Sequence, residues 1–278
     1  MSSKVPPIIL NNGVEMPQLG FGVWQVPDDE AERAVSTALE AGYRSIDTAA
    51  IYGNEEGTGK AIAAAGLPRK DVFVTTKLWN ADQGYDATLR GFDASLKKLG
   101  LDHVDLYLIH WPLPARDLYV DSYKAFEKLL EDGRVRAIGV SNFLPDHLQR
   151  LIDQTSVIPA VNQIELHPHL QQHASRAFHA EQGIATEAWS PLGQGKGLLE
   201  VPAVVAIAQK HNRTPAQVVL RWHLQLGNVV IPKSVTPSRI KENIEVFDFS
   251  LDTEDLAAIS ALNEDRRIGP DPATFDVG

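Results

Sequence analysis

The 278-residue sequence contains no cysteine, which excludes disulfides, thiolate catalysis and cysteine-ligated zinc sites. It also lacks any apolar run close to the roughly 20 residues that a membrane-spanning helix needs. Near the N-terminus, Pro6 and Pro7 interrupt a short apolar stretch, so this segment has neither the pattern of a secretion signal nor that of a span. We therefore expect a cytoplasmic protein whose chemistry uses groups other than thiols.

Positive charge is scarce. Lysine and arginine number 26 against 36 aspartates and glutamates, which gives a formal net charge of −10. Nucleic acids and anionic membranes both require a basic face, so we expect neither as a partner. A small anion in a local basic pocket is still compatible with this charge. Because coiled-coil heptads and large apolar stripes are also missing, we expect a monomer without an obligate protein partner.

What the sequence does contain is a regular alternation of apolar, β-rich segments with amphipathic helical ones. Hydrophobic residues make up 44% and charged residues 22%, enough for a large core. The β-rich segments span residues 19–23, 44–47, 72–77, 104–110, 135–140, 160–165, 184–189 and 229–232. Eight units of about 35 residues each suit a (β/α)8 barrel. We therefore predict an α/β TIM barrel that forms a single domain over residues 1–278.

The two ends of the chain lie outside this repeat. Asn12-Gly13 within IILNNGVEMP predicts a β-hairpin that plugs one end of the barrel, and residues 263–278 form a short polar tail. Within the repeat, Asp29 is suited to cap a helix that ends at Gly42. The rival is a doubly wound dinucleotide fold, but its fingerprint needs a third glycine that Gly20-Phe21-Gly22 lacks.

Polar residues occur at the carboxyl ends of three successive predicted strands, where barrel enzymes place their active sites. Asp47, Lys77 and His110 end these strands, and Tyr52 follows Asp47 closely. Each alone has an ordinary explanation as a turn cap, a packed aromatic ring, a surface charge or a core histidine. Together they make chemical sense, because a lysine held by a carboxylate is expected to lower the pKa of a neighbouring tyrosine and make it a usable acid.

Several motifs resemble those of the aldo-keto reductase family, in the family's order and over nearly the whole chain. They are IDTAAIYGNEEG, TTKLWN, LYLIHWP, GVSNF, NQIELHP and IPKSVTPSRIKEN. The segments AAIYGNEEG, NQIELHP and SPLGQGK are particularly similar to bacterial 2,5-diketo-D-gluconate reductase-like members. The resemblance implies that Asp47, Tyr52, Lys77 and His110 form the catalytic tetrad of an NADPH-dependent enzyme that reduces carbonyl groups.

The second half of the sequence carries the expected cofactor site. Three polar side chains end the fifth and sixth predicted strands, and the resemblance assigns them to the nicotinamide carboxamide: Ser141, Asn142 and Gln163. Trp189 ends the seventh strand, where its flat face is suited to stack on the nicotinamide ring. The resemblance also implies cofactor contacts at Val23, Trp24, Asp47, Ser190, Leu192, Gln194, Val235, Glu242 and Asn243.

Lys233, Ser234 and Arg239 follow the last predicted strand and open its helix. A solvated basic helix start is the ordinary explanation. Because cations there oppose the helix dipole, an anionic ligand explains them better, and a 2′-phosphate would favour NADPH over NADH.

The substrate pocket is expected to be aromatic, because tryptophans follow the first, third and fourth strands. We predict that its walls are Trp24, Trp79, His110 and Trp111, and that it takes a small carbonyl substrate.

Other chemistries fit less well. His167, His169 and His173 have no carboxylate at a ligand spacing, so we expect no metal. GVSNF lacks the second glycine of a nucleophile elbow, which argues against acyl transfer from Ser141. Two alternatives stay open: a regulatory subunit that binds NADPH without turnover, and another barrel enzyme such as a metal-dependent sugar isomerase.

Overall fold

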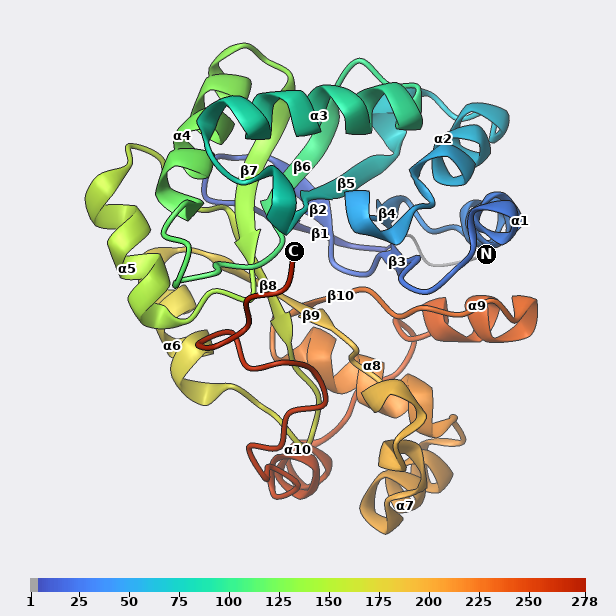
Figure 1. Cartoon of the computed structure of the whole chain (residues 1–278). Helices are drawn as coiled ribbons and strands as arrows, with labels where there is room; N and C mark the ends of the chain where they lie inside the picture. The colour runs from blue at the N-terminus through green and yellow to red at the C-terminus, as the bar shows by residue number, and fades with distance from the viewer. Residues whose placement is uncertain (1–4) are drawn as a thin grey trace.

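A computed structural model of the chain describes residues 5–278, and its centre is one sheet of eight parallel strands arranged in chain order (Figure 1). The strands are β3 (Phe21–Gly22), β4 (Ser45–Asp47), β5 (Phe73–Leu78), β6 (Val104–Ile109), β7 (Val135–Ser141), β8 (Val161–Glu165), β9 (Ala185–Trp189) and β10 (Val229–Val230). The sheet closes where Gly20 N donates to Val230 O at 2.8 Å and Val230 N donates to Gln18 O at 3.1 Å. The predicted (β/α)8 barrel is thus confirmed, although β3 and β10 are shorter than expected.

Helices surround the barrel. They are α1 (Asp28–Ala41), α2 (Glu55–Ala64), α3 (Tyr85–Leu99), α4 (Tyr119–Glu131), α5 (Pro145–Gln154), α6 (His173–Gln182), α7 (Pro202–His211), α8 (Pro215–Gln225), α9 (Pro237–Ile244) and α10 (Thr253–Ser260). Short 3₁₀ helices lie in the loops: η1 (Ala50–Tyr52), η2 (Arg69–Asp71), η3 (Asn80–Asp82), η4 (Gly193–Gly195) and η5 (Leu198–Glu200). Within residues 5–278, no helix has both the length and the apolar character that crossing a membrane requires.

Helix α1 shows how the sequence pattern produces an element. Its buried residues recur at helical spacing, so one face packs on the barrel. The helix ends as predicted at Gly42, which has φ 108° and donates to the carbonyls of Ala38 and Leu39. The predicted N-cap was wrong, because Pro27 holds that position and Asp29 lies inside the first turn. A carboxylate there still favours the helix, since it faces the positive end of the dipole.

The N-terminal hairpin closes the amino end of the barrel. Strand β1 (Pro7–Ile9) pairs antiparallel with β2 (Glu15–Pro17), and Gly13 takes φ 84° in the turn between them. Leu10 and Met16 are buried against the first residues of several barrel strands, among them Phe73, Val161 and Val229. The predicted plug is therefore present, and it leaves the carboxyl end of the barrel for the site.

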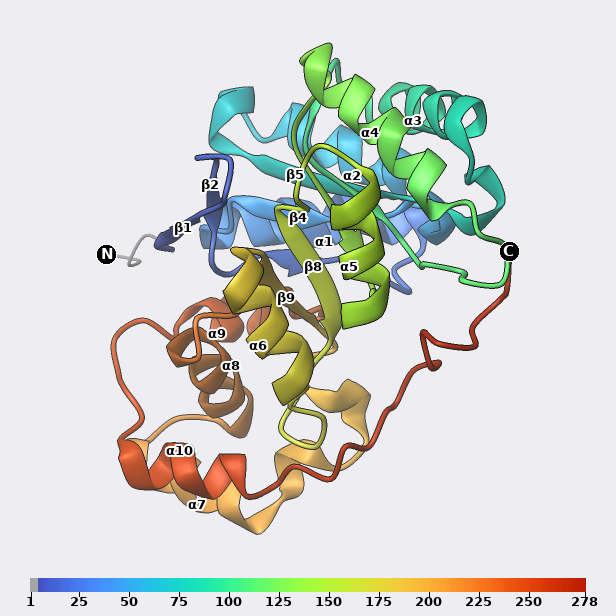
Figure 2. The ribbon, with the colours of Figure 1, turned by 90° about the vertical axis from the view of Figure 1, so that its left-hand side faces the viewer.

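The C-terminal tail, residues 263–278, crosses this carboxyl end, and we call it the strap. In Figure 2 it runs away from α10 to a terminus on the side opposite the hairpin. Near its start, the amides of Ile268 and Gly269 donate to Glu165 at 2.5 and 2.9 Å. Near its end, Phe275 packs on Trp111 with ring centroids 4.3 Å apart. Further contacts join Arg116 to Asp276 and Asn80 to Val277.

Candidate active site

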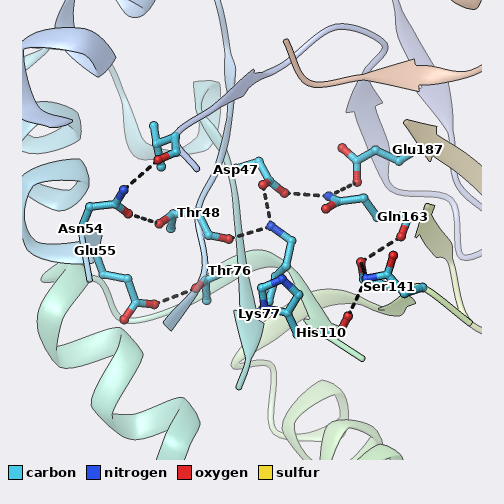
Figure 3. Close-up of polar contacts among 12 residues, drawn as sticks. Asp47, Thr48, Asn54, Glu55, Thr76, Lys77, His110, Ser141, Gln163 and Glu187 are labelled. Carbon is cyan, nitrogen blue, oxygen red and sulfur yellow. Dashed lines mark hydrogen bonds and ion pairs between the residues drawn. The ribbon is translucent and has the colours of Figure 1, made fainter. Parts of the chain in front are cut away.

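A buried ion pair lies at the centre of the barrel's carboxyl end. Asp47 is the last residue of β4, and Lys77 lies on the neighbouring strand β5. Lys77 Nζ donates to Asp47 Oδ1 at 2.5 Å and to Thr48 O at 2.9 Å (Figure 3). Burial lowers the pKa of Lys77, but Asp47 and Tyr52 outweigh it and leave that pKa raised. Lys77 is therefore a fixed ammonium ion inside the barrel.

Tyr52 ends η1 and lies beside this ammonium ion. The centroid of its ring is 5.1 Å from Lys77 Nζ and 5.7 Å from the centroid of the His110 ring. Burial raises the pKa of Tyr52, and the opposing effect of Lys77 is smaller, so the net pKa is raised. The prediction of a lowered pKa was wrong in its net direction, because it counted the lysine and not the burial. Tyr52 is consequently a neutral phenol at neutral pH.

His110 follows β6 and completes the group. Its ring lies between those of Tyr52 and Trp79, with a centroid distance of 5.4 Å to the latter. Burial, and then Lys77, lower the pKa of His110 well below its ordinary value. Its Nδ1 atom has no hydrogen-bond partner among residues 5–278. A neutral imidazole carries one N–H, which makes His110 an uncharged hydrogen-bond donor. The structure thus brings all four predicted catalytic side chains together.

Asn54 holds the loops around this group, and sequence reasoning assigned it no role. Its amide nitrogen donates to Val23 O and Val26 O, both at 2.8 Å, and its oxygen accepts from Thr48 Oγ1 at 2.7 Å. These bonds tie the loop that carries Trp24 to the end of β4. The only signal in the sequence is its place two residues after Tyr52, which indicates a turn but not its partners.

The residues predicted to hold the carboxamide lie together at the ends of β7 and β8. Ser141 Oγ donates to Gln163 O at 2.8 Å. Asn142 has φ 64°, donates to His110 O at 2.9 Å, and accepts from Trp189 Nε1 at 2.8 Å. The Trp189 ring is therefore held by its indole edge at the same end of the barrel.

The amide nitrogen of Gln163 bridges two carboxyl groups. It donates to Asp47 Oδ2 and to Glu187 Oε2, each at 2.8 Å (Figure 3). Glu187 lies on β9 and is fully buried; burial, followed by the charge of Asp47, raises its pKa to about 8. Sequence reasoning missed Glu187, although a charged residue in the middle of a short buried strand is a signal that could have found it.

Free positive charge surrounds the start of α9. Lys233 and Arg239 are exposed, and neither forms an ion pair with any residue in the described part of the chain. Ser234 Oγ accepts from Thr236 N at 3.1 Å, and Val235 is exposed beside it. Unpaired cations next to the amide groups of a helix N-terminus suit an anionic ligand such as a phosphate.

Other predicted cofactor contacts are partly engaged within the protein. Gln194 Nε2 donates to Ser190 Oγ at 2.7 Å in the loop after β9. Glu242 accepts from Thr214 Oγ1 at 2.8 Å. The remaining three differ in exposure: Leu192 is half-buried, Asn243 is buried, and Val23 is fully buried with its amide donating to Asp47 O.

The tryptophans predicted to line the substrate pocket differ in exposure. Trp24 is 41% exposed, Trp79 is half-buried, and Trp111 is covered by Phe275 of the strap. Ile51, which is 47% exposed beside Tyr52, is an apolar neighbour that the sequence reasoning did not include.

Two of the three histidines considered for a metal, His167 and His169, have other contacts. His167 Nε2 pairs with Glu165 at 2.9 Å, the same carboxylate that holds the strap. In the part of the chain that the structure describes, no three histidine, aspartate or glutamate side chains gather as a metal site.

Comparisons with known proteins agree on one family. The profile described as Aldo/keto reductase family matches residues 17–264. An aldo-keto reductase from Mycobacterium sp. (strain KMS) is 60% identical over 98% of each chain. Methylglyoxal reductase DkgA of Yersinia pestis is 57% identical over 97% of each chain. A solved structure of a Gox0644 mutant in complex with NADPH superposes with a TM-score of 0.95 and 50% identity, covering 99% of this chain and 100% of that one.

Proposed function

Because the chain belongs to the aldo-keto reductase family, we propose that it reduces aldehydes, ketones or diketo compounds to alcohols, with Tyr52 as the proton donor. The chain is an NADP-dependent oxidoreductase of this family. The observation that carries the proposal is the arrangement of Tyr52 beside a lysine that Asp47 holds in place. Because desolvation offsets much of the attraction between two buried charges, stability alone explains this ion pair poorly, and a role in the reaction explains it better.

The residues present suit NADPH. Gln163 Oε1 takes no hydrogen bond from the residues that the structure describes, so an acceptor is available for a carboxamide. Ser141 and Asn142 lie beside it. Lys233 and Arg239 would hold the 2′-phosphate as free cations, and this charge favours NADPH over NADH.

In the reduction, the chain moves one proton and stabilises charge. Bound NADPH supplies the hydride that reduces the carbonyl carbon. Tyr52 gives the proton of its hydroxyl group to the carbonyl oxygen, and Lys77 stabilises the phenolate that this leaves. His110 donates a hydrogen bond to the same oxygen and orients it. The tyrosine regains its proton from water, so hydride and proton together account for the alcohol.

A small carbonyl compound is the substrate that the mouth of the barrel fits best. Tryptophans border it, and Phe275 of the strap covers one of them. Methylglyoxal, named for the Yersinia pestis relative, belongs to this class. We therefore expect activity with small 1,2-dicarbonyl compounds.

The test is NADPH oxidation by the purified protein against methylglyoxal, a short aldehyde, a 2-ketoacid and a bulky aromatic ketone. We expect turnover with the small compounds and product alcohol in equal amount to the NADPH consumed. Tight NADPH binding without turnover on any of them would instead support the alternative of a non-catalytic NADPH-binding regulatory subunit.

A further inference from the structure

Glu187 is a buried carboxyl group that the proposed reaction does not use. It lies opposite Gln163 in the parallel pairing of β8 and β9, with its side chain fully buried. Its Oε2 atom accepts from Gln163, whereas Oε1 has no partner among residues 5–278. A buried carboxyl group with an oxygen that has no hydrogen-bond partner costs free energy whether or not it is ionised, so its presence here calls for a function.

One consequence of Glu187 is the orientation of the Gln163 amide. The amide nitrogen has two hydrogens, and two carboxyl acceptors, Asp47 and Glu187, take one each. Rotating the amide would turn its oxygen toward both acceptors and lose both bonds. Gln163 Oε1 is therefore fixed as the free atom, and an acceptor there matches the NH₂ group of a carboxamide.

A second consequence concerns charge inside the barrel. The groups that face Glu187 come from β4, β5, η1 and β8: Asp47, Lys77, Tyr52 and Gln163. The charges of Asp47 and Lys77 cancel, and Tyr52 is neutral. Because burial and Asp47 raise the pKa of Glu187 to about 8, this carboxyl group is mainly protonated at pH 7 and the whole group is neutral.

We propose that Glu187 is a positioning residue that orients Gln163 toward the nicotinamide carboxamide and supplies a negative charge when the bound ring is in its cationic, oxidised form. This inference rests on the proposed function, since it requires the ring to lie at the ends of β7 and β8. A nearby positive charge favours the ionised form of a carboxyl group. Glu187 therefore releases its proton to solvent when NADP⁺ is bound and takes one back when NADPH, whose ring is neutral, replaces it.

Proton release on binding is the direct measurement. The wild-type protein is titrated with NADP⁺ and with NADPH in weakly buffered solution, and the protons released per site are compared. Both cofactors carry the same phosphates, so the difference isolates the charge of the ring. Near pH 7 we expect NADP⁺ to release up to about one proton more, with the difference vanishing well above pH 8 because Glu187 is then already ionised. Equal release by the two cofactors across this range would overturn the inference.

Substitution assigns the proton to Glu187. Glu187→Gln keeps an acceptor for Gln163 but cannot ionise, so we expect the difference in proton release to disappear. Release of close to one proton at pH 7 requires the pKa of Glu187 to fall by about two units when NADP⁺ binds, from about 8 to about 6, so in this variant the Kd for NADP⁺ at pH 7 should rise about tenfold, while the Kd for NADPH stays within about twofold. Glu187→Leu removes the acceptor as well and is expected to weaken both cofactors. If the ratio of the Kd for NADP⁺ to the Kd for NADPH is the same in Glu187→Gln as in the wild type, the proposal is contradicted.

Glu55→Gln is the control, because Glu55 is another buried glutamate but accepts from Thr76 rather than Gln163, and its second oxygen lies 3.9 Å from Lys98 Nζ. It should retain the wild-type difference between the cofactors. If Glu187→Gln does not fold, the wild-type proton measurement still decides. If the wild-type protein binds neither cofactor, the proposed function is wrong. If it binds both cofactors but releases the same number of protons with each, the proposed function stands and only the role of Glu187 is wrong.

Discussion

Tyr52 and His110 share an environment that favours their neutral forms, and these charge states determine which of them can donate a proton or a hydrogen bond to the substrate. Burial raises the pKa of the phenol and lowers that of the imidazole. The permanent charges are those of Lys77 and Asp47, which are bonded to each other. The tyrosine is thus kept protonated until a substrate accepts its proton, and the ammonium ion lowers the cost of the phenolate that results.

Removal of the Tyr52 hydroxyl group should abolish most of the catalytic activity but leave the fold and NADPH binding intact. We expect Tyr52→Phe to lower kcat at least about 10²-fold, the usual scale for a positioned acid. The Kd for NADPH, measured by titration, should stay near that of the wild type. Tyr85→Phe, at a 41% exposed tyrosine on α3, is the control. Near-normal turnover in Tyr52→Phe would remove Tyr52 from the role of proton donor.

Lys77 should affect both activity and stability, and the two effects can be separated. Lys77→Met removes the charge that stabilises the phenolate and leaves Asp47 buried without its partner, which typically costs about 3–5 kcal/mol of stability. We expect a lower Tm and a loss of most activity. In the double variant with Asp47→Asn the Tm should largely recover, while activity should not. If the double variant recovers activity as well as Tm, the role of Lys77 is only structural.

At the scale of elements, the start of α9 combines two features that attract an anion. The helix N-terminus carries unpaired amide groups, and Lys233 and Arg239 add positive charge without internal ion pairs in the described residues. These cations work against the helix dipole until a ligand is bound. Cofactor choice is therefore expected to depend on this element rather than on the tetrad.

Arg239→Ala tests that dependence. A charge-assisted hydrogen bond contributes roughly 1.5–3 kcal/mol, so NADPH binding should weaken by about 10 to 150-fold at moderate salt. NADH lacks the 2′-phosphate, and its binding should change much less. Lys241→Ala, an exposed cation farther along the same helix, is the control. The measurement is titration of both cofactors, and equal losses for the two would mean that Arg239 does not bind the 2′-phosphate.

At the scale of the whole molecule, the two ends of the chain close the two ends of the barrel. The hairpin buries Leu10 and Met16 beneath the strands, and the strap crosses the carboxyl end. Of these two segments, it is the strap that lies over the predicted pocket, so we expect the size of the substrate to depend on it. We also predict a monomer, for which light scattering should give a mass near 30.5 kDa.

Phe275→Ala should loosen the cover of the pocket. An aromatic pair contributes about 0.5–1.5 kcal/mol beyond its buried area, so the KM for a small carbonyl substrate should rise roughly 2 to 12-fold. The kcat/KM for bulky ketones should fall less than that for small substrates, because removal of the Phe275 ring enlarges the pocket. The measurement is kcat/KM for one small and one bulky substrate, with Val277→Ala in the 61% exposed strap position as the control. If the ratio of kcat/KM for the small substrate to kcat/KM for the bulky one is the same in both variants, Phe275 does not contribute to substrate selection.

The sequence by itself determined the barrel and the location of its tetrad. Eight apolar segments at regular spacing predict βα units because buried parallel strands need apolar residues on both faces. Asp47, Lys77 and His110 could be grouped because the carboxyl ends of neighbouring strands meet at one mouth. Both inferences depend on local periodicity and chain order, which the sequence displays directly.

Only the tertiary structure decided the charge states and the contacts across the barrel. The raised pKa of Tyr52 depends on how deeply its ring is buried, and no spacing in the sequence encodes that burial. The bridge from Asp47 on β4 through Gln163 to Glu187 on β9 spans residues far apart in the chain. It forms because closure of the sheet turns side chains of distant strands toward one interior, and desolvation there, rather than residue type, fixes which groups hold protons.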